Sequence, residues 1–166
     1  MCKNLTDLTE KRFPNILTLG WESTHIIEVI SMQQVSILPL GAACEVGRSC
    51  LILTINNKKI MLDCGLMINK EDKDSLPLFE SINPEELSLI LITHAHLDHC
   101  GALPFFLAHY PNFKKKVFMT KPTKDIYHYL VRDTAKVQKD KALFNAQEIL
   151  DSLERIYPVE FGVQAE

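Results

Sequence analysis

The sequence lacks the features that mark three classes of protein. Its 166 residues contain no run of 18 or more apolar residues, which argues against a transmembrane helix. Its N-terminus has no apolar segment of the secretory type, so we expect no secretion signal. Its formal net charge is −3, so the chain as a whole lacks the basic character that many nucleic-acid-binding proteins show.

Cysteine is also sparse, with five residues that are odd in number and lack the spacing of a zinc finger. We interpret Cys2, Cys44, Cys50, Cys64 and Cys100 as reduced residues of a cytosolic or nuclear protein. Cys100 is either a metal contact or a packed core residue. The hydrophobic fraction of 46% is enough to build such a core.

The sequence does contain a dense group of metal-ligand side chains, HAHLDH at residues 94–99. His94 and His96 lie two residues apart, so an extended backbone points both imidazoles the same way. Asp98 and His99 follow where the chain turns into a helix, and they can address a second ion. These donors suit zinc or similar ions, and two ions on one loop are typical of sites that hydrolyse phosphoesters and other polar substrates. The alternative is a histidine-rich surface loop that arose by chance.

The flanking residues predict a layered α/β setting for this loop. Residues 87–93 form a nearly continuous apolar stretch, typical of a strand buried on both faces. Residues 105–108 predict a helix with Pro104 in its first turn. Ligands that follow a buried strand and precede a helix lie in the usual crevice of such a fold.

Residues 93–104 (THAHLDHCGALP) resemble the second motif of metallo-β-lactamase-fold nucleases of the β-CASP group. PLGA at 39–42 with EVGRSC at 45–50, KIMLDCG at 59–65, and residues 118–127 carry the same resemblance. Together they look most like the endonuclease subunits of the cleavage and polyadenylation specificity factor, with those of the Integrator complex close behind. The similarity runs from about residue 35 to about residue 160.

Two departures from the family pattern stand out. Ala43 and Cys44 occupy positions where such nucleases commonly carry glycine and glutamine. The first change matters only if the backbone there needs a positive φ or a close approach to substrate. The family's catalytic region is also several hundred residues longer than this chain.

The resemblance implies an α/β fold, the N-terminal half of a metallo-β-lactamase-type αββα sandwich, truncated in this chain. It also implies two-metal hydrolysis of an RNA phosphodiester in pre-mRNA 3′-end processing, with Zn²⁺ as the metal. His94 and His96 would bind the first ion, and Asp98 and His99 the second. The implied partners are pre-mRNA and other subunits of a cleavage/polyadenylation or Integrator-like complex, in the nucleus and away from any membrane.

Asp63 is predicted to support this site. It stands at a strand end before Cys64 and Gly65, where its carboxylate can hydrogen-bond and orient the metal loop. The resemblance assigns its family counterpart that role. A turn-capping aspartate before a glycine is the alternative.

Basic residues supply candidate RNA contacts. Lys and Arg outnumber Asp between residues 114 and 141, and this strip begins with Lys114, Lys115 and Lys116. A solvated helix face is the alternative explanation for the strip. Arg48 in the first loop is a candidate phosphate contact or a buried ion-pair partner.

We divide the chain into residues 1–34, an extension of unclear status, and residues 35–166, a partial metallo-β-lactamase domain. Met32 is a candidate initiator, and an ordinary N-terminal extension is the alternative.

The hydrophobic patterns predict further secondary-structure elements from residue 35 onward. These are strands at 35–40, 50–55, 59–63 and 117–119, a turn at 56–57, a capped start at 83–86, and helices at 74–82, 122–139 and 143–156.

Two protein ligands for each ion are fewer than the three of a catalytic zinc site. We therefore expect the 166 residues alone to bind zinc weakly, to leave RNA uncut and to expose apolar faces.

Two other functional classes remain open: a non-catalytic fragment or scaffold that docks to an RNA-processing complex, and a small-ester or thioester metallohydrolase of the same fold. The intact ligands argue against the first, and the EVGRSC and HCGALP stretches argue against the second.

Overall fold

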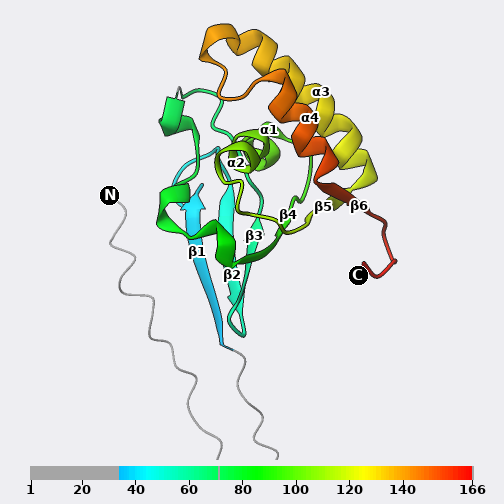
Figure 1. Cartoon of the computed structure of the whole chain (residues 1–166). Helices are drawn as coiled ribbons and strands as arrows, with labels where there is room; N and C mark the ends of the chain where they lie inside the picture. Colours follow the sequence, from blue (N-terminus) through cyan, green and yellow to red (C-terminus); the bar gives the residue numbers. More distant parts are fainter. Residues whose placement is uncertain (1–33, 71, 166) are drawn as a thin grey trace, which may run out of the picture. The chain divides into compact units, whose positions relative to one another are not determined.

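The computed structural model describes residues 34–70 and 72–165, so the extension expected at residues 1–34 lies outside it except for Gln34. The described residues form one six-stranded sheet, with the strands side by side in chain order (Figure 1). β1 to β3 pair antiparallel, and β3 to β6 pair parallel. The strands are β1 (Val35–Gly41), β2 (Cys50–Ile55), β3 (Lys58–Leu62), β4 (Leu87–Leu91), β5 (Val117–Thr120) and β6 (Ile156–Val159).

Helical segments connect the parallel strands, and Figure 1 shows the four α-helices grouped together. They are α1 (Leu97–Cys100), α2 (Leu103–His109), α3 (Lys121–Gln138) and α4 (Ala146–Glu154). Short 3-10 turns complete the connections: η2 (Asp72–Ser75), η3 (Phe79–Ser81), η4 (Pro84–Glu86) and η5 (Lys139–Lys141). Within the part of the chain that the structure covers, none of these helices has the length and apolar character needed to span a membrane.

One face of the sheet is the core of the fold. A ladder of apolar residues crosses five neighbouring strands on this face, and each is at most 3% exposed. Its members are Ile52, Met61, Ile90, Val117 and Ile156. Side chains from the helices complete the same core, among them Phe106, Tyr127, Val131 and Ile149. The core therefore holds the helices on one side of the sheet, as an α/β layer requires.

The opposite face of the sheet is apolar but not covered by the described residues. A second ladder crosses it through Leu51, Leu62, Leu91, Phe118 and Tyr157. Leu91 is 36% exposed and Tyr157 is 48% exposed. The prediction that residues 87–93 are buried on both faces is therefore wrong for this face. The expected exposure of an apolar face is confirmed.

Several local predictions match the structure. Asn56 and Asn57 adopt φ of 48° and 66° and close the hairpin between β2 and β3, as a two-residue turn of this twist requires. The side chain of Asn83 accepts a hydrogen bond from Glu85 N ahead of η4. The helix expected at 122–139 is α3, displaced by a single residue.

The helix expected at 74–82 is wrong, because this segment forms η2 and η3 on either side of Pro77. Proline has no N–H to donate within a helix. The next amide, Leu78 N, donates instead to Leu40 O of β1 at 2.9 Å. The segment is therefore hydrogen-bonded to the edge strand β1 and does not form one continuous helix.

The helix expected at 143–156 is too long at both ends. α4 begins after Asn145, whose side chain accepts from the amides of Gln147 and Glu148 in a capping box. It ends at Glu154, and Ile156 then opens β6, a strand that the sequence patterns did not predict. Pro158 lies within β6, and a proline is tolerated there because β6 is an edge strand.

We expect the exposed sheet face to bind an apolar dye and to make the chain self-associate. Substituting Ile37→Lys together with Tyr157→Lys should lower dye fluorescence and shift sedimentation toward the monomer, because both residues lie on exposed parts of the sheet. Ile126→Lys on α3 is the matched control, since Ile126 is 51% exposed but lies on a helix. Equal effects of the two changes would contradict this assignment.

Candidate metal centre

The candidate ligands lie at the carboxyl end of β4, as predicted. Ile92 N still pairs with Phe118 O of β5 at 2.9 Å, and the chain leaves the sheet after this residue. His96 has an extended conformation (φ −62°, ψ 140°) and directly precedes α1. His96 thus stands on extended backbone, while Asp98 and His99 lie in the single turn of α1.

Backbone hydrogen bonds hold this loop against the end of β3. Cys64 N donates to His99 O and Leu66 N donates to Leu97 O, both at 2.8 Å. Ser49 N donates to Asp98 O at 2.8 Å, which ties the EVGRSC stretch to the same loop. A Cβ atom on Gly65 would lie 1.8 Å from Asp98 O, so only glycine permits this approach. The sequence motifs that suggested the family therefore meet in space.

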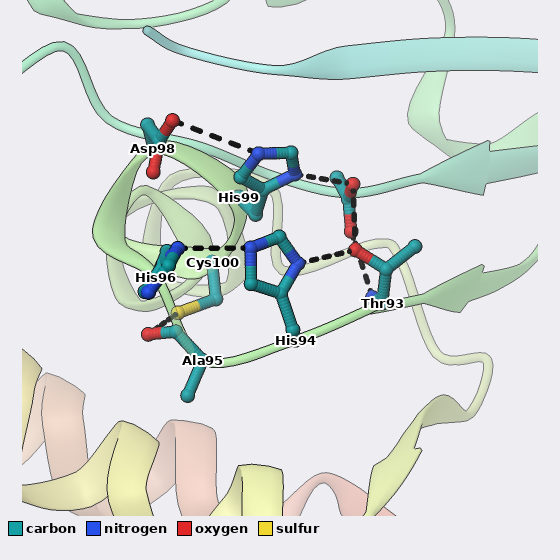
Figure 2. Close-up of polar contacts among 8 residues, drawn as sticks. Thr93, His94, Ala95, His96, Asp98, His99 and Cys100 are labelled. Carbon is teal, nitrogen blue, oxygen red and sulfur yellow. Dashed lines mark hydrogen bonds and ion pairs between the residues drawn. The ribbon is translucent and has the colours of Figure 1, made fainter.

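The donor atoms of the loop converge in two pairs (Figure 2). His94 Nε2 lies 3.1 Å from His96 Nδ1. His99 Nε2 lies 3.6 Å from Asp98 Oδ2. The pairs are adjacent, since the rings of His94 and His99 have centroids 4.2 Å apart. Across the described residues, no group of three or more His, Cys, Asp or Glu side chains is arranged to hold a metal ion.

Asp63 is buried beneath the loop and accepts three hydrogen bonds from it. Oδ1 accepts from Thr93 N at 2.8 Å. Oδ2 lies 3.1 Å from Thr93 Oγ1 and 2.8 Å from His99 Nδ1. The side chain therefore hydrogen-bonds two residues of the loop, Thr93 and His99, and its support of a metal site stays a prediction. Asp63 has a φ of 61°, so the backbone turns sharply as it leaves β3.

Thr93 is the residue of this network that the sequence patterns did not single out. Its hydroxyl contacts Asp63 Oδ2 on one side and His94 Nδ1 on the other, the latter at 2.9 Å. A hydroxyl residue immediately before the first histidine of the motif was the available signal. The role of this hydroxyl depends on its hydrogen bond to Asp63, which lies 30 residues away in the chain.

Three cysteines pack beneath the same loop. Cys50, Cys64 and Cys100 are fully buried, and Cys100 Sγ donates to Ala95 O at 3.2 Å. Burial, with a further contribution from the charges of Asp63 and Asp98, raises the pKa of the Cys100 thiol to about 12. Burial likewise raises the pKa values of Cys50 and Cys64. Cys100 is therefore a packed residue, and the four described cysteines are all reduced.

Arg48 has structural partners in the first loop. Its Nε donates to Glu45 Oε1 at 2.6 Å, and its Nη1 donates to Asp74 O at 3.2 Å and Leu76 O at 3.0 Å. Arg48 is therefore an ion-pair partner, but the pair is partly exposed (21% and 39%) and not buried as that alternative expected. Its carbonyl contacts fasten the loop to the segment around η2. In the same loop, Ala42 has a positive φ of 59° whereas Ala43 does not, so the expected Gly-to-Ala difference at 43 carries no backbone strain.

Lys114, Lys115 and Lys116 are exposed but do not lie beside the candidate ligands. They precede β5, which runs parallel to β4 with Val117 opposite Ile90. The lysines are thus at the amino end of β5, whereas the ligands follow the carboxyl end of β4. The structure does not bring these two sets of predicted site residues together.

Residues 45–140, more than half of the chain, match the model of the metallo-beta-lactamase superfamily. Together with the α/β layer and the ligand loop at its edge, this match shows that the chain belongs to that superfamily.

Curated relatives confirm the narrower resemblance to β-CASP nucleases. The chain is 43% identical over 128 residues to cleavage and polyadenylation specificity factor 73 of Drosophila melanogaster, covering 75% of this chain and 19% of the relative. It is 40% identical over 134 residues to an Integrator complex subunit 11 homolog of Dictyostelium discoideum, covering 75% and 18%. It is 38% identical over 133 residues to endoribonuclease YSH1 of Saccharomyces cerevisiae, covering 74% and 17%. The chain thus spans less than a fifth of the length of these three relatives.

A solved structure of AidC, a dizinc quorum-quenching lactonase, is a more distant match. It shares 19% identity with a TM-score of 0.45, and the alignment covers 70% of this chain and 44% of AidC. At this level the similarity does not bear on the function of this chain.

The buried thiols should resist alkylation in the folded protein. Only a thiolate attacks iodoacetamide rapidly, and burial keeps Cys50, Cys64 and Cys100 protonated at pH 8. We expect peptide mapping to find exposed Cys44 modified within minutes and these three modified only after unfolding in urea. Rapid labelling of Cys100 in the folded chain would contradict its placement in the core.

Arg48→Met should destabilise the fold without changing RNA affinity. It removes the contacts to Asp74 O and Leu76 O, so we expect the free energy of unfolding to fall by about 1–3 kcal/mol in urea titrations. Lys114→Met with Lys115→Met should have the reverse pattern if the lysines bind RNA: unchanged stability and weaker binding by fluorescence anisotropy at low salt. RNA binding lost in the Arg48 variant at full stability would support the phosphate-contact alternative instead.

Proposed function

We propose that this chain supplies one side of the two-zinc site of a metal-dependent RNA endonuclease of pre-mRNA 3′-end processing. The observation that carries the proposal is the convergence of four donor atoms in two adjacent pairs at the carboxyl end of β4. His94 and His96 would hold the first ion, and Asp98 and His99 the second. Asp63 would support both from beneath.

The separations within the pairs suit zinc. Two ligands at tetrahedral positions, each about 2.0–2.1 Å from the ion, lie about 3.3 Å apart. The observed separations are 3.1 Å for His94 Nε2 and His96 Nδ1, and 3.6 Å for Asp98 Oδ2 and His99 Nε2. Imidazole and carboxylate donors with no thiolate also match the ligand chemistry of hydrolytic zinc sites.

Bound zinc would supply a Lewis acid that polarises the phosphate and activates water. The protein groups would hold the metal ligands in position. Asp63 holds His99 by its Nδ1, so that Nε2 faces the side of Asp98. The backbone hydrogen bonds donated by the amides of Cys64 and Leu66 hold the loop backbone in place without an ion. Pre-arranged ligands of this kind lower the cost of assembling the site.

The relatives named above support the wider setting. We propose that the substrate is pre-mRNA, that the partners are other subunits of a cleavage/polyadenylation or Integrator-like complex, and that the protein acts in the nucleus. Lys114, Lys115 and Lys116 would then contact RNA that passes the far end of the sheet, remote from the ions.

A second candidate function is a scaffold that docks to such a complex without cutting RNA. The exposed apolar ladder through Leu91, Phe118 and Tyr157 favours it, because surfaces of this kind mark interaction sites. The two candidates differ in their dependence on His94: docking would survive its loss, whereas RNA cleavage would not.

Zinc binding by the purified chain should be weak and should depend on the loop. Each ion has two protein donors in the described residues, fewer than the three of a catalytic site. We expect chelator competition to show weak binding that is reduced in His94→Ala and in His99→Ala, because each removes one of the two donor pairs, with no cleavage of RNA by the chain alone. His128→Ala on α3 is the control and should bind as the wild type does. Cleavage by the purified chain would contradict the ligand count.

A chimera tests the endonuclease assignment itself. Residues 35–166 would replace the matching segment of yeast endoribonuclease YSH1, to which the chain is 38% identical over 133 residues. We expect the chimera to cleave RNA and the same chimera with His94→Ala to be inactive although it still assembles with its partners. A chimera that folds and assembles but does not cleave would favour the scaffold.

A further inference from the structure

We propose that Thr93 is a positioning residue that fixes the proton of His94 on Nδ1 and so presents Nε2 to the metal. Through Thr93, the single carboxylate of Asp63 orders imidazoles assigned to both ions. The metal part of this proposal rests on the proposed function, whereas the hydrogen-bond chain belongs to the metal-free protein.

The direction of the hydrogen bonds follows from the chemistry of the carboxylate. An ionised carboxylate accepts hydrogen bonds and has none to donate. Thr93 Oγ1, 3.1 Å from Asp63 Oδ2, is therefore the donor in that contact. A hydroxyl has one proton, and this one is committed to Asp63.

The hydrogen bond between Thr93 Oγ1 and His94 Nδ1 can then have only one direction. Thr93 Oγ1 lies 2.9 Å from His94 Nδ1 and has no further proton to give, so it must accept. His94 Nδ1 therefore carries the N–H. In a neutral imidazole the other nitrogen is then unprotonated, which leaves the lone pair on Nε2.

The free lone pair of His94 points toward the partner ligand. Nε2 lies 3.1 Å from His96 Nδ1, so in the metal-free chain His96 can donate to it, and an ion can replace that proton. His99 follows the same rule by a shorter route, because its Nδ1 donates directly to Asp63 Oδ2 at 2.8 Å. One buried carboxylate thus fixes His99 directly and His94 through a hydroxyl.

Thr93 is held in place independently of its hydroxyl. Its amide donates to Asp63 Oδ1 at 2.8 Å, a bond that substitution of the side chain leaves intact. Thr93→Val keeps the branched shape and removes only the hydroxyl, whereas Thr93→Ser keeps the hydroxyl. The pair therefore separates the hydrogen bond from packing. Thr134→Val is the matched control, because the Thr134 hydroxyl donates only to Leu130 O within α3.

The test is nitrogen-15 NMR of the histidine side chains in the zinc-free 166-residue chain at pH 8, where an unperturbed imidazole is neutral. We expect His94 to show the Nδ1–H tautomer, the opposite of the preference of free histidine. Thr93→Val should populate Nε2–H, while Thr93→Ser and Thr134→Val should match the wild type. In chelator competition with zinc, Thr93→Val should bind about tenfold more weakly and Thr93→Ser nearly as the wild type.

The Nε2–H tautomer at His94 in the wild-type chain would overturn the proposal, and this result needs no variant to fold. An unchanged tautomer in a folded Thr93→Val variant would also overturn it. A shifted tautomer with unchanged zinc affinity would overturn the effect on the metal. If Thr93→Val shifts the tautomer while even the wild type binds no zinc, the positioning role holds and the proposed zinc site fails.

Discussion

The buried carboxylate of Asp63 is the interaction on which the site depends. It is 6% exposed and accepts hydrogen bonds from Thr93 N, Thr93 Oγ1 and His99 Nδ1. A buried charge without such partners would cost several kcal/mol. The loop after β4 therefore cannot move away without leaving Asp63 unsatisfied. Asp63 N also donates to Leu91 O at 2.8 Å, so the ends of β3 and β4 are joined at the same place.

The ligand loop is consequently arranged by the protein before any ion binds. The amides of Ser49, Cys64 and Leu66 donate to successive carbonyls of the loop. Buried Cys100 and Ala102 anchor its far side in the core. This support accounts for the zinc-like separations within the two donor pairs. A bound ion, as proposed, would add to a shape that hydrogen bonds and packing have already specified.

The parts of the structure that were predicted from sequence depend on local chemistry. The candidate ligand loop follows an apolar strand, and the Asn56–Asn57 turn adopts positive φ. Asn83 caps a short helical turn. Each of these features is determined by residues close by in the sequence. The parts that were missed depend on distant partners. Arg48 bonds to carbonyls 26 and 28 residues away, and Thr93 acquires its role from Asp63. β6 exists only because its four residues pair with β5, and the separation of the lysines from the ligands follows from strand direction.

The central claim is that two donor pairs at the carboxyl end of β4 hold zinc. Diffraction from crystals of the zinc-loaded chain, recorded on both sides of the zinc absorption edge, tests it most directly. The account predicts anomalous peaks in contact with His94 Nε2 and His96 Nδ1, and with Asp98 Oδ2 and His99 Nε2. A zinc peak bound by the sulfur atoms of Cys64 or Cys100, with these four side chains unoccupied, would contradict it.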